Sequence, residues 1–407
     1  MQIVNLKYPV PVTMKKTSAQ APISFKYIDS DQAMFSFADE NSDIEWLAMD
    51  TEFVSEKRYD ALLCLIQITT PIGNYIVDPF KCKDLDPLFE MIEDERVIKI
   101  THAGENDFRL LFSQFNVVPV NVFDTQVAAG FVGYPYPTSF GKLVSGECGI
   151  ELNKSYGAAD WEKRPLTRDY LTYALNDVIY LHELFTKFSE KLQNLGRFDW
   201  AIEEMSRMED ENFYIRDPHR EALQSSLMNG ISFEKQVFTM RLFDWRRTEA
   251  QRVNHSKEMV LAIKHFQPII RGIEHGQQTL LDNRFLPAYI VHTHIRTWQR
   301  LWETPATDEE ITRLSNRPKS SSEDPLMQLS RDLVHSMVKY RCLETGVAHS
   351  LVLSKSDLFS GDDSDSDDSL TTGWRAELLG HELAKWMSEH RPLRLDFRDG
   401  QCIISPQ

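Results

Sequence analysis

Apolar runs bounded by polar residues mark the first half of the chain as rich in strands. Residues 44–53 read IEWLAMDTEF, a run typical of a buried strand. Short connections join it to apolar runs at 61–70 and 74–78, and such connections predict an antiparallel meander. Further strands are predicted at 97–101 and 120–123, and helices at 85–92, 106–115 and 125–131. Strands followed by strand–helix alternation indicate a mixed α/β sheet flanked by helices.

Helical spacing of apolar residues takes over from residue 166 to about 195, and beyond residue 200 almost every segment has a helical pattern. Amphipathic helices are predicted at 245–266, 297–302 and 373–387. Residues 316–325 have the composition of a linker, and 360–369 (SGDDSDSDDS) form an acidic, low-complexity loop that we expect to be disordered. The predicted division is a lead-in over 1–24, an α/β domain over 25–200, a connecting helical segment over 201–234, a helical domain over 235–315 and a second helical region over 316–407. The C-terminal half is thus expected to be all-α.

The charge distribution changes the picture that the net charge suggests. A net charge of −16 on 407 residues argues, taken alone, against a partner rich in phosphate groups. Residues 31–130, however, carry −12 of that charge, and residues 231–300 hold 11 basic against 6 acidic side chains. An acidic domain loaded with cations beside a basic domain fits work on nucleic acids. Charge alone fits an acidic protein with an ordinary surface equally well.

Cysteine spacing and hydropathy limit the kinds of structural site and the cellular location that we expect. The five cysteines are widely spaced and form no C-x-x-C pair, which disfavours a disulfide framework or a zinc site. No basic N-terminal start precedes a long apolar stretch, and no apolar run approaches the ~18 residues of a membrane span. We therefore expect a cytoplasmic protein that does not contact membranes, with a monomer as the favoured state.

Three groups of polar residues carry the candidate chemistry. Asp50 and Glu52 lie two apart in a strand and so face the same side, where two like charges are unfavourable unless a cation lies between them. Asp107 lies in HAGEND, where a strand is followed by a helix. Tyr173 and Asp177 are four apart in a helix and share a face. Each group alone has a plainer interpretation: a solvated turn, a first-turn acid that the helix dipole favours, and a surface pair that satisfies itself.

Together these groups are more specific than any one of them. Four carboxylates can hold two hard divalent cations ~4 Å apart, and such a pair stabilises the attacking and leaving oxygens of a phosphodiester. A tyrosine beside the cations can orient the attacking water or help to deprotonate it.

The same segments resemble a known family. DTEF at 50–53, HAGEND at 102–107 and YALND at 173–177 are similar to the three exonuclease motifs of the DEDDy group, in matching order and spacing. The segments between these motifs, among them LIQI, VDP, VFDTQVAA and DWEKRPLT, also resemble ribonuclease D, so that the resemblance covers about residues 40–190. The resemblance implies an RNase H-like exonuclease fold that removes nucleotides from RNA 3′ ends with two Mg²⁺ or Mn²⁺ ions. In one respect the chain departs from the family: Ala158-Ala159 stand where members commonly have an Arg-Ser/Thr pair, which puts substrate contacts from that loop in doubt.

The resemblance also assigns residues. Its four metal ligands would be Asp50, Glu52, Asp107 and Asp177, and its water-positioning residue would be Tyr173.

Substrate contacts are predicted less directly. Phe53 is a candidate for stacking on the terminal base, His102 for touching the terminal ribose or phosphate, and Arg164 for meeting the RNA backbone, with Trp161 in the same loop. Core packing for Phe53 and Trp161, and a hydrogen-bonded structural role for His102, remain open alternatives.

The helical half adds a second resemblance. Residues ~235–305 resemble an HRDC domain, and the resemblance rests on FDWRRTEAQRVNHSKEMVL at 243–261. Arg246 and Arg247 are candidate phosphate contacts there, with Arg252 and Lys257. The alternative is a solvated basic face of a structural bundle. Residues 325–400 resemble the second helical region of ribonuclease D.

The functional hypothesis is hydrolysis of RNA from its 3′ end with release of nucleoside 5′-monophosphates. The family implies substrates with single-stranded 3′ ends, such as structured RNA precursors and tRNA 3′ trailers. Two alternatives stay open: a 3′→5′ DNA exonuclease of the same fold, and a catalytically inactive RNA-binding scaffold. An RNA-modifying enzyme with another cofactor is disfavoured because no glycine-rich nucleotide loop is found.

Overall fold

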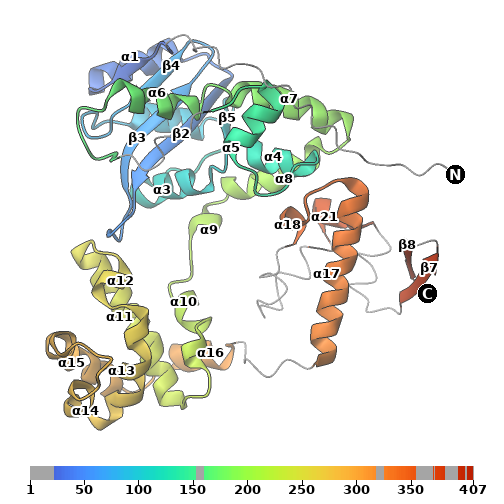
Figure 1. Cartoon of the computed structure of the whole chain (residues 1–407). Helices are drawn as coiled ribbons and strands as arrows, with labels where there is room; N and C mark the ends of the chain where they lie inside the picture. Colours follow the sequence, from blue (N-terminus) through green and yellow to red (C-terminus); the bar gives the residue numbers. More distant parts are fainter. Residues whose placement is uncertain are drawn as a thin grey trace.

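A six-stranded mixed sheet forms the centre of the N-terminal domain in the computed structural model (Figure 1). The structure describes residues 23–152, 160–317, 325–353, 370, 372–380, 393–398 and 401–406. The strand order is β1-β4-β3-β2-β5-β6. The bounds are β1 (Lys26–Ile28), β2 (Trp46–Val54), β3 (Leu62–Thr69), β4 (Asn74–Val77), β5 (Ile98–Thr101) and β6 (Val122–Asp124). β2, β3 and β4 form the predicted antiparallel meander, while β5 and β6 extend the sheet in parallel.

Strand β1, which pairs in parallel with β4, and helix α1 (Asp31–Glu40) were not predicted. Ser30 caps α1 by accepting a hydrogen bond from the Ala33 amide, but Met34 and Phe37 are the helix's only buried residues. Because only two of its ten residues are buried, α1 lacks the continuous apolar stripe that predicts a helix from sequence.

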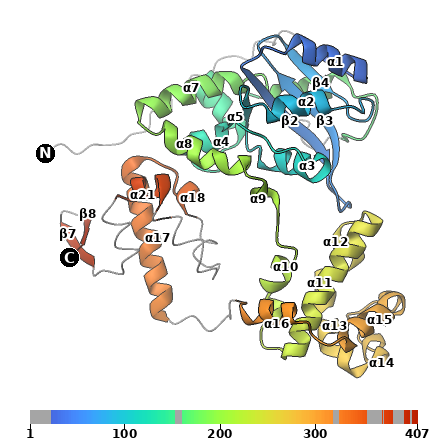
Figure 2. The same cartoon turned by 180° about the vertical axis from the view of Figure 1, so that it is seen from behind.

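Helices cover both faces of the sheet (Figures 1 and 2). The helices of this domain are α2 (Asp86–Glu93), α3 (Glu105–Phe115), α4 (Thr125–Phe131), α5 (Phe140–Leu143), α6 (Arg168–Asn176), α7 (Leu181–Asn194) and α8 (Phe198–Met205). One face packs against Leu175 of α6 and against Val178, which follows that helix, and the other packs against α1, α2 and α3. The helix predicted over 166–195 is two helices, α6 and α7. No glycine or proline marks the break, so only tertiary packing sets it.

A second hydrophobic core lies in a helical domain, residues 220–315. It comprises α10 (Arg220–Leu223), α11 (Phe233–Val253), α12 (Lys257–Val260), α13 (Phe266–Gly272), α14 (Gln277–Leu281), α15 (Ala288–Glu303) and α16 (Asp308–Ser315). The single helix predicted at 245–266 is wrong. Helix α11 begins twelve residues earlier and ends at Val253, where Asn254 adopts a left-handed conformation with φ 47°. Asparagine tolerates that conformation better than most residues and commonly closes a helix.

The last helices pack on the N-terminal domain. They are α17 (Pro325–Thr345), α18 (His349–Val352) and α21 (Gly373–Leu379). Trp374 is buried and meets Phe131 of α4 edge-on, with ring centroids 4.7 Å apart. Val338 and Cys342 of α17 belong to the same hydrophobic core. The predicted helix 373–387 is described only to Leu379, where Gly380 (φ 85°) ends it.

An antiparallel hairpin of β7 (Leu393–Arg398) and β8 (Gln401–Pro406) follows in a half that was predicted to be all-helical. The acidic segment 360–369 and the pair Ala158-Ala159 lie outside the described residues, as does most of the predicted linker 316–325. No helix among the described residues is long and apolar enough to span a membrane.

The hairpin between β2 and β3 reaches the helical domain (Figures 1 and 2). The Ser256 amide donates to the Lys57 carbonyl at 3.0 Å. The Asn254 side-chain oxygen accepts from the Tyr59 and Asp60 amides at 3.1 and 3.2 Å. The strand pair that carries Asp50 and Glu52 is therefore in direct contact with the helical domain.

Candidate active site

Strand β2 places Asp50 and Glu52 side by side on the sheet face that α6 covers. Their partners on β3 are Gln67 and Leu65, and a bulge follows at Glu52/Phe53. The pairing of β2 with β5 ends at Ala48. Beyond that point only β3 flanks β2, so one edge of the acidic segment is open to groups from elsewhere in the chain.

Helix α6 brings the third acid. Leu175 of α6 and Val178, just after the helix, are buried against the sheet, and Asp177 follows the last helical residue. Carboxylate oxygens of Asp50, Glu52 and Asp177 all lie within 4.8 Å of one another. The structure therefore brings Asp177 to two acids that precede it by more than a hundred residues in the sequence.

Asp107 reaches the open edge of β2 from the start of α3. Its Oδ1 accepts hydrogen bonds from the Thr51 amide, at 3.2 Å, and from the Thr51 hydroxyl. Asp107 is not one of the three clustered acids, but its charge contributes to the raised pKa of Asp50. Thr51 was missed by sequence reasoning. Strand alternation was the available signal, since it turns Thr51 away from the face of Asp50 and Glu52.

The start of α3 depends on Gly104. The Gly104 amide donates to Asp124 Oδ2 at 2.8 Å. A Cβ at this position would lie 2.6 Å from the Thr101 hydroxyl, closer than side-chain atoms approach. Glycine thus lets the chain turn tightly from β5 into α3, and this turn sets where Asp107 points.

Asp107 is buried and the other three acids are half-buried, and no cation among the described residues forms an ion pair with any of the four. Burial is the largest cause of the raised pKa of each. It raises the pKa of Glu52 to about 8 and those of Asp107 and Asp177 to about 6. The pKa of Asp50 rises well above its usual value, through burial and then through repulsion from Asp107, Asp177 and Glu52. A set of oxygen ligands with uncompensated charge suits hard divalent cations, which neutralise the carboxylates and keep bound water.

Tyr173 lies one helical turn before Asp177. Burial, followed by the charges of Asp177, Glu52 and Asp50, raises the pKa of its hydroxyl to about 12. The hydroxyl therefore stays protonated at neutral pH and acts as a hydrogen-bond donor. The buried Trp161 ring lies 6.4 Å from the Tyr173 ring and limits where the phenol can move.

Arg164 fastens the Trp161 loop to the sheet. It donates to both oxygens of the buried Asp78, at 2.8 and 3.0 Å. It also donates to the carbonyls of Cys64 and Trp161, each at 2.7 Å. Burial alone would raise the pKa of Asp78, but hydrogen bonds from Arg164 and Tyr27 outweigh it and lower that pKa. The arginine predicted to meet RNA is thus committed to holding Trp161 in place.

His102 and Phe53 lie near the site with contacts of their own. The His102 Nδ1 is 3.0 Å from the Thr125 hydroxyl, and burial lowers the pKa of its ring, which stays neutral at pH 7. Phe53 is half-buried against the main core. These contacts agree with core packing for Phe53 and with a hydrogen-bonded structural role for His102. That either residue touches RNA remains a prediction.

The basic face predicted on α11 is neutralised by acids. Arg246 is only 3% exposed, and it pairs with Glu258 at 2.5 Å and with Glu221 at 3.6 Å. Arg247 pairs with Asp244 at 3.2 Å. The remaining two cations are bound in the same way, Arg252 by Glu249 and Lys257 by Glu221. The structure therefore does not offer Arg246 to a phosphate, and the other three cations already have acidic partners.

Comparison with known proteins agrees with this geometry. A family model described as a 3′-5′ exonuclease matches residues 25–193. Ribonuclease D of Zymomonas mobilis is 30% identical over 351 residues, which cover 83% of this chain and 87% of that protein. Ribonuclease D of Nitrobacter hamburgensis is 29% identical over 367 residues, covering 88% and 93%.

The crystal structure of Escherichia coli RNase D, described as an exoribonuclease involved in structured RNA processing, has the same fold. It matches with a TM-score of 0.78 at 23% identity, over 90% of this chain and 100% of that one. The exonuclease motifs, the carboxylate cluster and the long matches of sequence and fold agree with one another. The chain therefore belongs to the ribonuclease D family of 3′–5′ exonucleases.

Proposed function

We propose that this protein hydrolyses RNA from the 3′ end and releases nucleoside 5′-monophosphates. The observation that carries the proposal is the clustering of Asp50, Glu52 and Asp177 oxygens within 4.8 Å, with Asp107 at the adjoining edge of β2. Acids clustered in this way can bind divalent cations that promote phosphodiester hydrolysis.

The donor set fits two divalent cations, Mg²⁺ or Mn²⁺. Asp50, Glu52, Asp107 and Asp177 would hold them. Once bound, such cations supply positive charge to the attacking and leaving oxygens of a phosphodiester. The raised pKa values of the acids support this assignment, because burial and then mutual repulsion disfavour their charged forms, and a bound cation would offset both.

Tyr173 holds the attacking water in line. One helical turn before Asp177, its hydroxyl would orient the attacking water or help to deprotonate it. Trp161 packs beside Tyr173, and the Arg164–Asp78 pair holds the loop that carries Trp161. These residues position Tyr173 without touching the substrate.

The substrate class is proposed from the family. RNA precursors with single-stranded 3′ ends, including tRNA trailers, are the substrates that we propose for this chain. Its relatives are named ribonuclease D, and the Escherichia coli protein is described as involved in structured RNA processing. The HRDC-like character of the helical domain, a cytoplasmic location and a monomeric state belong to the same proposal.

A time course on 5′-labelled RNA and on DNA of the same sequence tests the proposal. We expect RNA to shorten from its 3′ end by single nucleotides in Mg²⁺ or Mn²⁺, and EDTA or Asp50→Ala to abolish the shortening. Faster shortening of DNA would assign the site to a DNA exonuclease. Metal-dependent shortening of neither polymer would favour an RNA-binding scaffold.

A further inference from the structure

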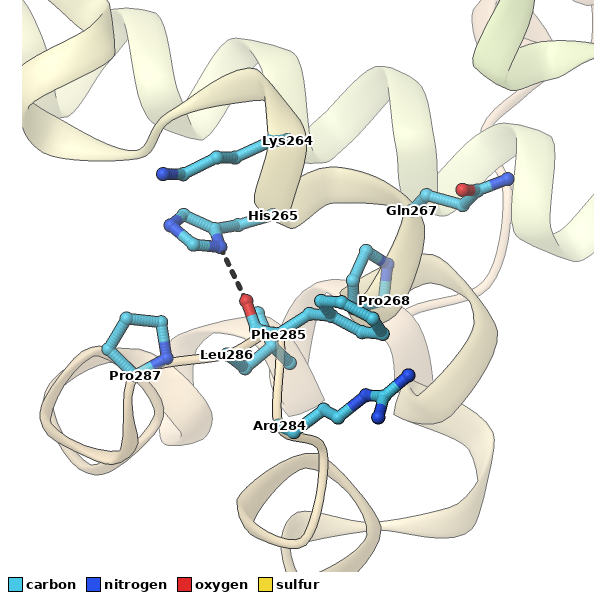
Figure 3. A pocket seen from close by; sticks show the side chains of 8 residues that line it. All are labelled: Lys264, His265, Gln267, Pro268, Arg284, Phe285, Leu286 and Pro287. Carbon is cyan, nitrogen blue, oxygen red and sulfur yellow. Dashed lines mark hydrogen bonds between the residues drawn. The ribbon is translucent and has the colours of Figure 1, made fainter.

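A shallow pocket in the helical domain lies between the segment that begins α13 and the loop before α15 (Figure 3). Its volume is about 570 Å³, within the ~300–1,000 Å³ typical of sites for small ligands. The lining residues are Lys264, His265, Gln267, Pro268, Arg284, Phe285, Leu286 and Pro287. None of them is acidic, and none belongs to the catalytic centre.

The two cations of this pocket differ from those of α11. Within the described part of the chain, no carboxylate lies within ion-pair distance of Lys264 or Arg284, whereas all six lysines and arginines of α11 and α12 have acidic partners. Unpaired cations around a pocket attract an anion, because no internal carboxylate already satisfies them.

Phe285 presents an exposed aromatic ring on a fixed backbone. Its amide donates to Asn283 Oδ1 at 3.0 Å, and its carbonyl lies 2.8 Å from His265 Nδ1. The residue is nevertheless 60% exposed, and the Arg284 guanidinium lies 4.8 Å from the ring centroid. A large apolar ring held outward by hydrogen bonds at both of its backbone groups is suited to stack a planar ligand.

We propose that this pocket binds one nucleotide of single-stranded RNA, with the base stacked on Phe285 and the phosphate contacted by Lys264 and Arg284. A base and a phosphate are the two halves of a nucleotide, and the pocket offers one partner for each. The proposal rests on the proposed function in one respect, that the substrate is RNA. Because none of the catalytic acids lines the pocket, the nucleotide it binds is upstream of the 3′ end that is cut.

Binding of a fluorescent single-stranded RNA of about 20 nucleotides, measured by polarisation in EDTA, tests the proposal. The full chain carrying Asp50→Asn serves as background, so that no cleavage occurs. Phe285→Ala is expected to weaken binding about 5- to 150-fold, the range that loss of one stacked base produces. Phe285→Trp keeps a stacking ring and should restore binding. Arg252→Ala, which removes a surface cation that is already paired, is the matched control and should change affinity less than twofold.

The outcomes separate this proposal from the proposed function. Unchanged binding by Phe285→Ala and by Lys264→Ala/Arg284→Ala would overturn the pocket assignment, even with RNA shortening intact. Equal loss in Arg252→Ala would also overturn it, since only general charge would then matter. Absence of both binding and shortening of RNA by the unaltered chain would instead refute the proposed function. Thermal unfolding of each variant shows whether it remains folded.

Discussion

The catalytic centre gathers negative charges and the pocket of the helical domain gathers positive ones, and in both regions these charges lack an ion-pair partner among the described residues. In the centre, Asp50, Glu52 and Asp177 gather without a balancing cation. In the pocket, Lys264 and Arg284 have no carboxylate within ion-pair distance among the described residues, although α11 nearby pairs each of its exposed cations. Charged side chains without an ion-pair partner are therefore the ones available to a ligand, whereas paired ones stabilise the fold. Counting charges in the sequence does not make this distinction.

The largest expected effect comes from removing one acid of the centre. Asp50→Asn should lower the rate of RNA shortening by about 10⁴-fold, equivalent to about 5 kcal/mol of activation free energy, because the site loses a central ligand. Asp39→Asn, an exposed position on α1, is the matched control. Single-turnover rates in saturating Mg²⁺ measure the effect. A loss below tenfold would remove Asp50 from the proposed ligand set.

Breaking the Arg164–Asp78 pair should chiefly affect stability. Arg164→Met leaves the buried Asp78 carboxylate unpaired, for which we expect a loss of about 3–5 kcal/mol in the free energy of unfolding. Urea denaturation measures it. Arg58→Met, which breaks the more exposed pair with Glu162, should lose at most about 1 kcal/mol. Equal losses of unfolding free energy in the two variants would show that Arg164 does not hold the Trp161 loop on the sheet.

Tyr173→Phe removes one hydroxyl and retains the ring that packs against Trp161. We expect kcat to fall about 10²-fold with little change in RNA binding, because the water loses its orienting donor. Tyr170→Phe, one turn earlier on α6 and also beside Trp161, is the control. A fall in RNA affinity that matches the fall in kcat would instead make Tyr173 a substrate-binding residue.

The sequence predicted the centre far better than the helical domain, for a physical reason. DTEF, HAGEND and YALND pointed to acids that lie within β2, in the first turn of α3 and directly after α6, and the fold brings these acids to one place. Apolar periodicity predicted five of the six strands of the sheet. Strand alternation places Thr51 on the face opposite the two acids beside it, but only the folded structure shows that Asp107 bonds it.

The helical domain depends instead on tertiary pairing. Arg246 has the spacing of a surface cation, but Glu221 and Glu258 approach it only after folding. Lys264 and Phe285 lie about twenty residues apart, and nothing local indicates that they share a pocket. The break between α6 and α7 was unpredictable in the same way.

A smaller effect should appear in the stability of the metal-free protein. Burial raises the pKa of Glu52 to about 8, whereas an unfolded glutamate titrates near 4.5. The folded state thus binds the extra proton, so the stabilising contribution is present below pH 4.5 and is lost as the pH rises towards 8. In EDTA, Glu52→Gln should melt a few degrees above the unaltered chain at pH 8, and the difference should shrink towards pH 5.

Saturating Mn²⁺ should reverse that order, because the unaltered chain gains a ligand that the variant lacks. Melting curves at pH 5 and pH 8, with and without Mn²⁺, measure both effects. Equal melting temperatures in all four conditions would contradict the uncompensated charge at Glu52.

The smallest expected effect is on the salt dependence of RNA binding. Arg284→Ala should reduce the slope of log affinity against log salt by about one, because one phosphate contact is lost. Arg252→Ala should leave the slope unchanged, since Glu249 already neutralises that side chain. Equal changes in the two slopes would remove the distinction between paired and unpaired cations.

The most direct test of this division of labour compares kcat/KM on RNAs of about 5 and about 25 nucleotides. Asp50→Asn should lower hydrolysis of both RNAs to the same extent, because both are cut at the same centre. Phe285→Ala should lower kcat/KM for the long RNA and leave the short RNA unchanged, because only the long one has an upstream nucleotide for the pocket. An equal loss on both lengths in Phe285→Ala would contradict the separation of cutting at β2 and α6 from RNA binding in the helical domain.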